Sequence, residues 1–158
     1  MNLYVTANAD ADNDGNDWIN VVQTSQASST EIVVGDFDQC GAVDNPTEGS
    51  TRKDISTELA INDYRSFTLD ATGISWVSKT GFTFLGTREG HDAIDSPVVY
   101  TDGATLTGCS FASSEDTAGT KDPYLEVTVA SAGSNTPSHT PSHTPSNTPS
   151  NTPSHTPS

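Results

Sequence analysis

Short runs of alternating apolar and polar residues dominate the first 130 residues of the chain. Such runs, rich in β-branched and aromatic residues and separated by Gly, Asp, Asn and Ser, are typical of β-strands joined by turns. We expect strands over 3–6, 18–23, 31–34, 64–69, 82–87, 105–111 and 124–129. The pattern therefore predicts an all-β domain, a β-sandwich or jelly roll.

One segment, 70–81, departs from this alternation. Ile74, Trp76 and Val77 favour one short amphipathic helical turn. Asp70 is the expected N-cap, because its carboxylate can accept a hydrogen bond from a backbone N–H of the first turn, and Gly81 is the expected end. A second turn is expected around 36–41.

The last 24 residues, 135–158, repeat an Asn/His-Thr-Pro-Ser tetrapeptide six times. Proline at every fourth position excludes helix and central strand and holds the preceding Thr extended. We therefore expect a polyproline II rod, roughly 75 Å long at ~3.1 Å per residue. A period of four on a helix of about three residues per turn distributes the hydroxyls around the rod. The chain is thus divided into a β-sandwich domain, 1–133, and a tail, 134–158.

The tail composition is typical of O-glycosylated, mucin-like stalks, with an undecorated flexible linker as the alternative. The expected glycan acceptors are Thr136, Thr140, Thr144, Thr148, Thr152 and Thr156, together with Ser138, Ser142, Ser146, Ser150 and Ser154. Prolyl hydroxylation is a further expected modification, at Pro137, Pro141, Pro145, Pro149, Pro153 and Pro157. Covalent glycans on the tail would make the protein extracellular or exposed at a cell surface.

All 21 acidic and 6 basic residues precede the tail, so the net charge of −15 is carried by the domain. Such a field repels nucleic acid and anionic membrane surfaces. No apolar stretch is long enough to span a membrane. The charge suits a soluble extracellular protein or one that binds divalent cations.

Two cysteines, Cys40 and Cys109, lie in a chain whose tail indicates an oxidising compartment. We expect a disulfide between them, and two buried free thiols are the alternative. The disulfide would close a loop of about 70 residues, worth ~4 kcal/mol in the chain-entropy picture.

An acidic loop at 10–17 carries carboxylates on alternate residues, with Gly15 at the expected bend. Ca²⁺ prefers such oxygen ligands, so a calcium site is one interpretation and a solvated acidic loop the other. The loop only partly matches an EF-hand, because Val21 stands where the bidentate Glu would be. The candidate ligands are Asp10, Asp12, Asp14 and Asn16.

A second acidic run follows Arg88 and contains Glu89, His91 and Asp92. No nucleophile elbow or metalloprotease motif accompanies it, so we expect a loop salt bridge made by Arg88 and no catalytic residue. The protein is expected not to be an enzyme. Aromatic residues that could stack on a sugar are Trp18, Trp76, Tyr64 and Tyr100. For Trp76 we expect core packing instead, and with so few aromatics the sequence indicates no strong glycan-binding platform.

Three stretches, 18–41, 63–92 and 119–130, together resemble the C-terminal two thirds of DNRLRE-type jelly-roll domains of large secreted and surface proteins. The resemblance implies a jelly-roll sandwich, an extracellular location and a role in adhesion, carbohydrate binding or scaffolding, without catalysis. The matching positions resemble core and turn residues: Phe67, Leu69, Trp76, Leu85, Gly86, Arg88, Asp122, Pro123, Leu125 and Val127.

Domains of that type have strands before the segment that begins here at Asn2. Either an upstream piece is missing, or a neighbouring copy supplies a strand, which would build filaments. We therefore expect a structural subunit that forms a homo-oligomer or filament through its sheet edges. The alternative is a carbohydrate-binding or adhesion module joined by the tail to another domain of a secreted protein.

Overall fold

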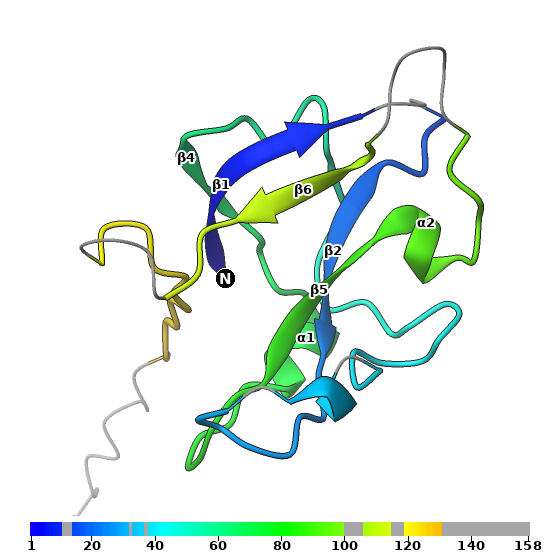
Figure 1. Ribbon diagram of the computed structural model, residues 1–158. Helices are drawn as coiled ribbons and strands as arrows, with labels where there is room; N and C mark the ends of the chain where they lie inside the picture. The colour runs from blue at the N-terminus through cyan, green and yellow to red at the C-terminus, as the bar shows by residue number, and fades with distance from the viewer. Residues whose placement is uncertain (11–13, 32, 37, 100–105, 115–118, 131–158) are drawn as a thin grey trace, which may run out of the picture. The chain divides into compact units, whose positions relative to one another are not determined.

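Two three-stranded antiparallel sheets form the framework of the computed structural model, which describes residues 1–10, 14–31, 33–36, 38–99, 106–114 and 119–130 (Figure 1). The first sheet has the order β4-β1-β6, and the second has the order β3-β2-β5. Their bounds are β1 Asn2–Ala9, β2 Trp18–Gln23, β3 Lys53–Asp54, β4 Asp63–Ser66, β5 Leu85–Glu89 and β6 Gly108–Phe111. The predicted all-β class is confirmed. The tail lies outside the described residues.

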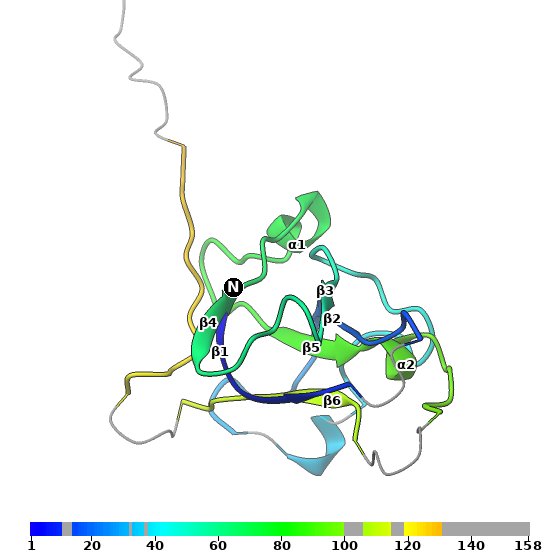
Figure 2. The ribbon, with the colours of Figure 1, turned by 90° about the horizontal axis from the view of Figure 1, so that it is seen from above.

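Contacts group Met1–Val127 into one compact unit, which contains both sheets. Both sheets direct alternate side chains into one hydrophobic core. Figure 2 shows the two sheets from above, with β1 and β6 on one side of β2 and β5. β1 and β2 follow the period of two expected of strands, because alternate residues point to the same face. The buried members of the core are Leu3, Val5, Ile19, Val21, Ile55, Leu59 and Phe67. Each fully buried side chain of this size contributes about 1.5–3 kcal/mol.

β2 is covered on both faces: every residue from Trp18 to Val22 is buried. Ile19 and Val21 face the core, so Trp18 and Val22 face the opposite side of the sheet. There Trp18 meets Gly90, the first residue of α2, and Val22 meets Gly86 of β5. A Cβ built on Gly90 would stand 2.6 Å from the Trp18 ring, and one on Gly86 would stand 3.9 Å from Val22.

The helical segments are short: η1 Val34–Asp36, α1 Ala71–Ser75 and α2 Gly90–Ala93. Asp70 caps α1 as predicted, since its Oδ1 accepts a 2.9 Å hydrogen bond from Gly73 N. Gly81 does not end the helix. The N–H of Trp76 bonds to Gly73 O, three residues back, so the last turn tightens and α1 stops there. Gln39 N also bonds to Asp36 O, within the turn expected around 36–41.

Two predicted strands are absent from the part of the chain that the structure describes. In the segment 31–34, Val34 is 95% exposed and belongs to η1. The Asp36 carboxylate accepts hydrogen bonds from the N–H groups of Val33 and Ala27, which favours a local turn over a strand. In 124–129, only Tyr124 pairs, through a bridge to Asn2. The remaining residues of that segment join no sheet within the described part of the chain.

Candidate functional site

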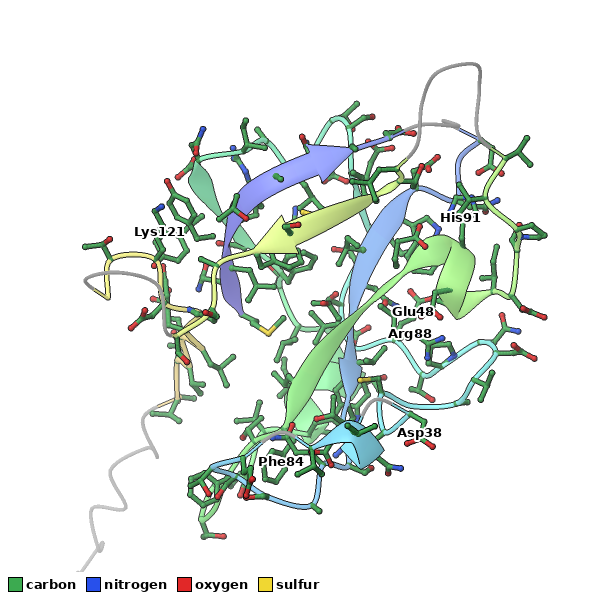
Figure 3. The ribbon with its side chains drawn as sticks, viewed as in Figure 1. Asp38, Glu48, Phe84, Arg88, His91 and Lys121 are labelled. Atoms are coloured by element: carbon green, nitrogen blue, oxygen red, sulfur yellow. The ribbon has the colours of Figure 1, made fainter. Side chains whose placement is uncertain are left out.

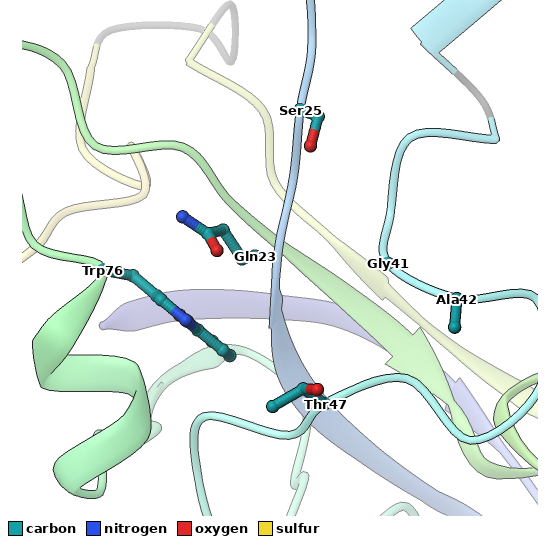
Figure 4. Close-up of a pocket in the computed structure, with 6 residues that line it drawn as sticks. All are labelled: Gln23, Ser25, Gly41, Ala42, Thr47 and Trp76. Atoms are coloured by element: carbon teal, nitrogen blue, oxygen red, sulfur yellow. The ribbon is translucent and has the colours of Figure 1, made fainter.

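An open surface pocket of about 240 Å³ lies beside the C-terminal end of β2. We call it the Trp76 pocket. Its lining residues are Gln23, Ser25, Gly41, Ala42, Thr47 and Trp76 (Figure 4). They come from the end of β2, the loop that covers the outer face of the sheet, and the residue that follows α1. Figure 4 shows the indole of Trp76 extending from the end of α1 toward Thr47.

The position of Trp76 follows from a close backbone contact between α1 and the loop before β3. A Cβ on Gly49 would stand 2.1 Å from Cζ3 of Trp76, and a Cβ on Gly73 would stand 2.1 Å from the Gly49 carbonyl oxygen. The Asp70 N–H donates to that carbonyl at 3.0 Å. Only glycines allow this approach, so the two of them and the Asp70 cap fix the indole.

Arg88 holds the opposite wall of the pocket, 40–43. Its guanidinium donates hydrogen bonds to the carbonyl oxygens of Ala42 at 3.1 Å and Val43 at 2.9 Å. It also pairs with the carboxylate of Asp92, and its side chain is only 12% exposed. The expected loop salt bridge of Arg88 is therefore present. Figure 3 shows Arg88 pointing from β5 to the loop that covers the sheet.

The wall that contains Thr47 is held through its neighbour Glu48, which bridges to Val22 of β2. Arg52 donates two hydrogen bonds of 3.1 and 2.6 Å to Glu48 Oε1. These bonds lower the pKa of the Glu48 carboxyl below its usual value. The Arg52 guanidinium also lies 3.8 Å from the centroid of the Trp18 ring. Each wall of the Trp76 pocket thus has its own anchor.

The other candidate sugar-stacking aromatics are differently placed. Trp18 is buried beneath Arg52 and does not line the Trp76 pocket. Tyr64 packs edge-on between Tyr4 and Tyr124, with centroid distances of 5.3 and 5.2 Å. Its hydroxyl donates to the carbonyl oxygen of Asp122 at 3.0 Å, which fastens the segment 120–124 to the first sheet. Tyr100 lies outside the described residues.

The acidic loop and the second acidic run meet at His91, which is 3% exposed. Its Nδ1 lies 2.9 Å from Glu89 Oε1, and its Nε2 lies 3.4 Å from Asp14 Oδ1. Asp14 also accepts hydrogen bonds from the backbone and side-chain nitrogens of Asn16. The sequence did not indicate this pairing, because the two segments are about 75 residues apart.

The predicted calcium ligands are only partly described. Asp10, Asp14 and Asn16 lie in the described part of the chain, while Asp12 lies outside it. No group of three or more His, Cys, Asp or Glu arranged to hold a metal ion occurs among the described residues. Asp14 directs its carboxylate to Asn16 and His91. The calcium site stays a prediction.

Cys40 and Cys109 are both free thiols in the structure, so the expected disulfide is not formed in it. A sheet separates them. Cys109 packs against the core, whereas Cys40 Sγ is 3.6 Å from a Cβ built on Gly86, on the outer face of β5. Burial raises the pKa of the Cys109 thiol to about 11.

β5 is the last strand of its sheet in the described residues, and its backbone pairing with β2 can be followed residue by residue. Thr24 N donates to Phe84 O at 3.3 Å, just beyond the ladder. Hydrogen-bonded pairs alternate along an antiparallel ladder. The Val22–Gly86 pair, two residues along, is therefore hydrogen-bonded.

The neighbouring pair, Val21 and Thr87, is a non-hydrogen-bonded pair of the antiparallel ladder. Val21 O accepts from Gly49 N at 2.8 Å and Val21 N donates to Ser50 Oγ at 3.1 Å, both on the side away from β5. The backbone groups of Thr87 therefore point away from β2. The same alternation applies to the residues two positions before and after it. The outward-pointing residues of β5 are thus Leu85, Thr87 and Glu89.

No protein-family model, curated protein or solved structure matches this chain. The resemblance to DNRLRE-type domains stays a prediction. No helix in the described part of the chain is long and apolar enough to cross a membrane. The expected glycan acceptors and hydroxylation sites, 136–157, lie outside the described residues.

Proposed function

We propose that the chain is a structural subunit of an extracellular fibril or surface stalk. It self-associates through the edges of its sheets and carries glycans on the Thr-Pro-Ser tail. The observation that carries this proposal is the outer edge of β5, where Leu85, Thr87 and Glu89 direct their backbone groups away from β2. An outer strand of this kind is a template for a strand from another chain.

The segment 125–129 has the properties of the strand that this edge would accept. Leu125, Val127 and Val129 occupy alternate positions, and the two valines are 54% and 81% exposed. Val residues favour extended chains, which is why the sequence predicts a strand here. Within the described residues the segment joins no sheet beyond the bridge at Tyr124. Pairing with β5 of a second copy would place the segment 125–129 in a sheet.

Such a contact is heterologous, because the two copies use different surfaces. Heterologous contacts that do not close into a ring build open filaments. The tail follows the donated segment in the chain, so each added copy would bring one tail to the assembly. Glycans all around a polyproline II rod would then form a hydrated coat. The proposed fold of the subunit is a jelly-roll sandwich.

The first experiment blocks the edge of β5. Thr87→Pro removes a backbone N–H that points away from β2, so the β2–β5 ladder keeps its hydrogen bonds. Thr87→Val retains the N–H and is the matched control. Light scattering after size exclusion and negative-stain microscopy of the full chain should show filaments for Thr87→Val and monomers for Thr87→Pro. A monomeric parent chain that forms no filaments would overturn the proposal.

The second experiment tests the donated segment. Val127→Asp places a charge on its apolar side and should abolish filaments, whereas Val34→Asp, at a valine that is 95% exposed in η1, should leave them unchanged. A synthetic peptide of residues 121–130, added in excess, should also cap the β5 edge and shorten filaments. Mass spectrometry of tail peptides from the native source tests the glycans independently of assembly.

A further inference from the structure

We propose that the Trp76 pocket binds one residue of a neutral sugar. This inference does not depend on pairing at the β5 edge, which lies in a different part of the second sheet. It assigns a place for the carbohydrate binding that the sequence left as an alternative. Four properties of the pocket carry it: the charge of its lining, its aromatic wall, its size and its rigidity.

The lining of the pocket is polar but uncharged. None of the six described residues that line it is acidic or basic, although the chain contains 21 acidic and 6 basic residues. The amide of Gln23 and the hydroxyls of Ser25 and Thr47 can both donate and accept hydrogen bonds. Neighbouring hydroxyls of a sugar need such partners. An anionic ligand, by contrast, would be repelled by the net charge of −15.

Trp76 supplies the apolar part of the pocket. One face of a pyranose ring carries mostly C–H groups, which pack favourably on the electron-rich face of an indole. Trp76 is half-buried, so part of its ring contacts Gly49 and part remains open to the pocket. A pocket with one aromatic wall and a few convergent polar groups is the usual form of a small-molecule site.

The volume of about 240 Å³ sets the size of the ligand. It corresponds to roughly eight water molecules at ~30 Å³ each. It is also below the ~300–1,000 Å³ of pockets that hold drug-sized molecules. The pocket therefore has room for one sugar residue.

The walls are held before any ligand arrives. Arg88 holds the carbonyl of Ala42, and Glu48, next to Thr47, bridges to Val22 of β2. The Trp76 indole packs against Gly49. A site that is already in its binding conformation loses less conformational entropy when the ligand binds. This arrangement distinguishes the pocket from a gap between mobile loops.

The test titrates the full chain with the methyl glycosides of glucose, galactose, mannose and N-acetylglucosamine, and follows the two indole N–H signals by NMR. Trp18 is an internal control, because it is buried beneath Arg52. We expect at least one neutral glycoside to shift the Trp76 signal saturably and to leave the Trp18 signal in place. Methyl glucuronide, which is anionic, should bind at least tenfold more weakly.

Ala42→Leu is the decisive variant, because it fills the pocket from an exposed loop position without changing α1 or Trp76. It should weaken binding at least tenfold. Ile74→Ala is the matched control: Ile74 belongs to α1 but is 61% exposed and does not line the pocket. Its binding should equal that of the parent chain. The proposal is overturned if no neutral glycoside shifts the Trp76 signal, or if Ala42→Leu binds as well as the parent.

Discussion

Gly49 lies against the indole of Trp76 so closely that a Cβ on Gly49 would stand 2.1 Å from Cζ3 and 2.6 Å from Cη2 of the ring. Because α1 cannot move away without breaking the Asp70–Gly49 hydrogen bond, Gly49→Ala should overpack this contact. We expect the free energy of unfolding in urea to fall by about 1–3 kcal/mol. The Trp76 fluorescence spectrum should shift in the folded state.

Gly35→Ala is the control for this substitution. A Cβ on Gly35, in η1, meets no atom within 4 Å. Its free energy of unfolding should therefore stay within about 0.5 kcal/mol of the parent value. If Gly49→Ala and Gly35→Ala lowered the free energy of unfolding equally, the close contact between α1 and Gly49 would not be the cause of the loss.

Arg88→Lys tests the anchor of the loop 40–43. Lysine keeps the charge but lacks the planar fork that reaches several carbonyl oxygens at once. A single ammonium group would not reach the carbonyls of both Ala42 and Val43, so we expect a loss of about 2–3 kcal/mol in urea unfolding. Hydrogen exchange of the loop amides should accelerate in the folded protein.

The matched change is Arg52→Lys, at a guanidinium that pairs with Glu48 on the surface. Exposed pairs contribute little, so the expected loss is at most about 1 kcal/mol. If Arg52→Lys lowered the free energy of unfolding more than Arg88→Lys, the prediction that Arg88 contributes more to stability would be contradicted.

Cys109 should react slowly with iodoacetamide. Raising its pKa from 9.0 to about 11 lowers the thiolate fraction at pH 8 about a hundredfold. The unfolded thiol loses its proton from about pH 9 upward, whereas the folded one keeps it until about pH 11. Stability should therefore decrease as the pH rises across this interval. Denatured, unreduced protein that contains no titratable thiol would instead show that the disulfide with Cys40 forms.

The predicted calcium site is tested by chemical unfolding with and without the ion. A site formed by Asp10, Asp12, Asp14 and Asn16 should stabilise the folded state by about 2.7 kcal/mol at a hundredfold excess over Kd. EDTA should reverse the gain. Asp14→Asn should reduce the gain, while Asp38→Asn, at an exposed carboxylate elsewhere, should not. Identical unfolding curves with Ca²⁺ and with EDTA would contradict the prediction.

Alternation of side chains was enough to place β2 at its observed bounds and to locate β1 and β4 approximately. It worked for β1 and β2 because the core takes alternate side chains from them, Leu3 and Val5 from β1 and Ile19 and Val21 from β2. β3 was not predicted, since the pair Lys53–Asp54 has no apolar pattern and exists only because it lies beside Trp18 and Ile19. Val33 and Val34 favour a strand by residue type, but both side chains are exposed and pack against no core.

The Trp76 pocket was beyond the reach of the sequence for a related reason. Trp76 was noted as an aromatic that could stack on a sugar, but its partners come from segments distant in the chain. The useful signal was glycine: Gly49 and Gly73 permit the contact that orients the indole. In the same way, Arg88 was expected to form a salt bridge, while its carbonyl partners at 42 and 43 depend on the tertiary fold.

The bridge between Asn2 and Tyr124 has a mechanical consequence. Two backbone hydrogen bonds of 2.8 and 3.1 Å join these residues, and Tyr124 is the last residue of the chain in any described bridge or strand. A pulling force on the tail enters the domain at this point and acts first on these two bonds and on the hydroxyl of Tyr64 that holds the preceding segment. The central strand β1 would feel the load before the core does. Tension would therefore peel the terminal segment first and leave the hydrophobic core as the last part to yield.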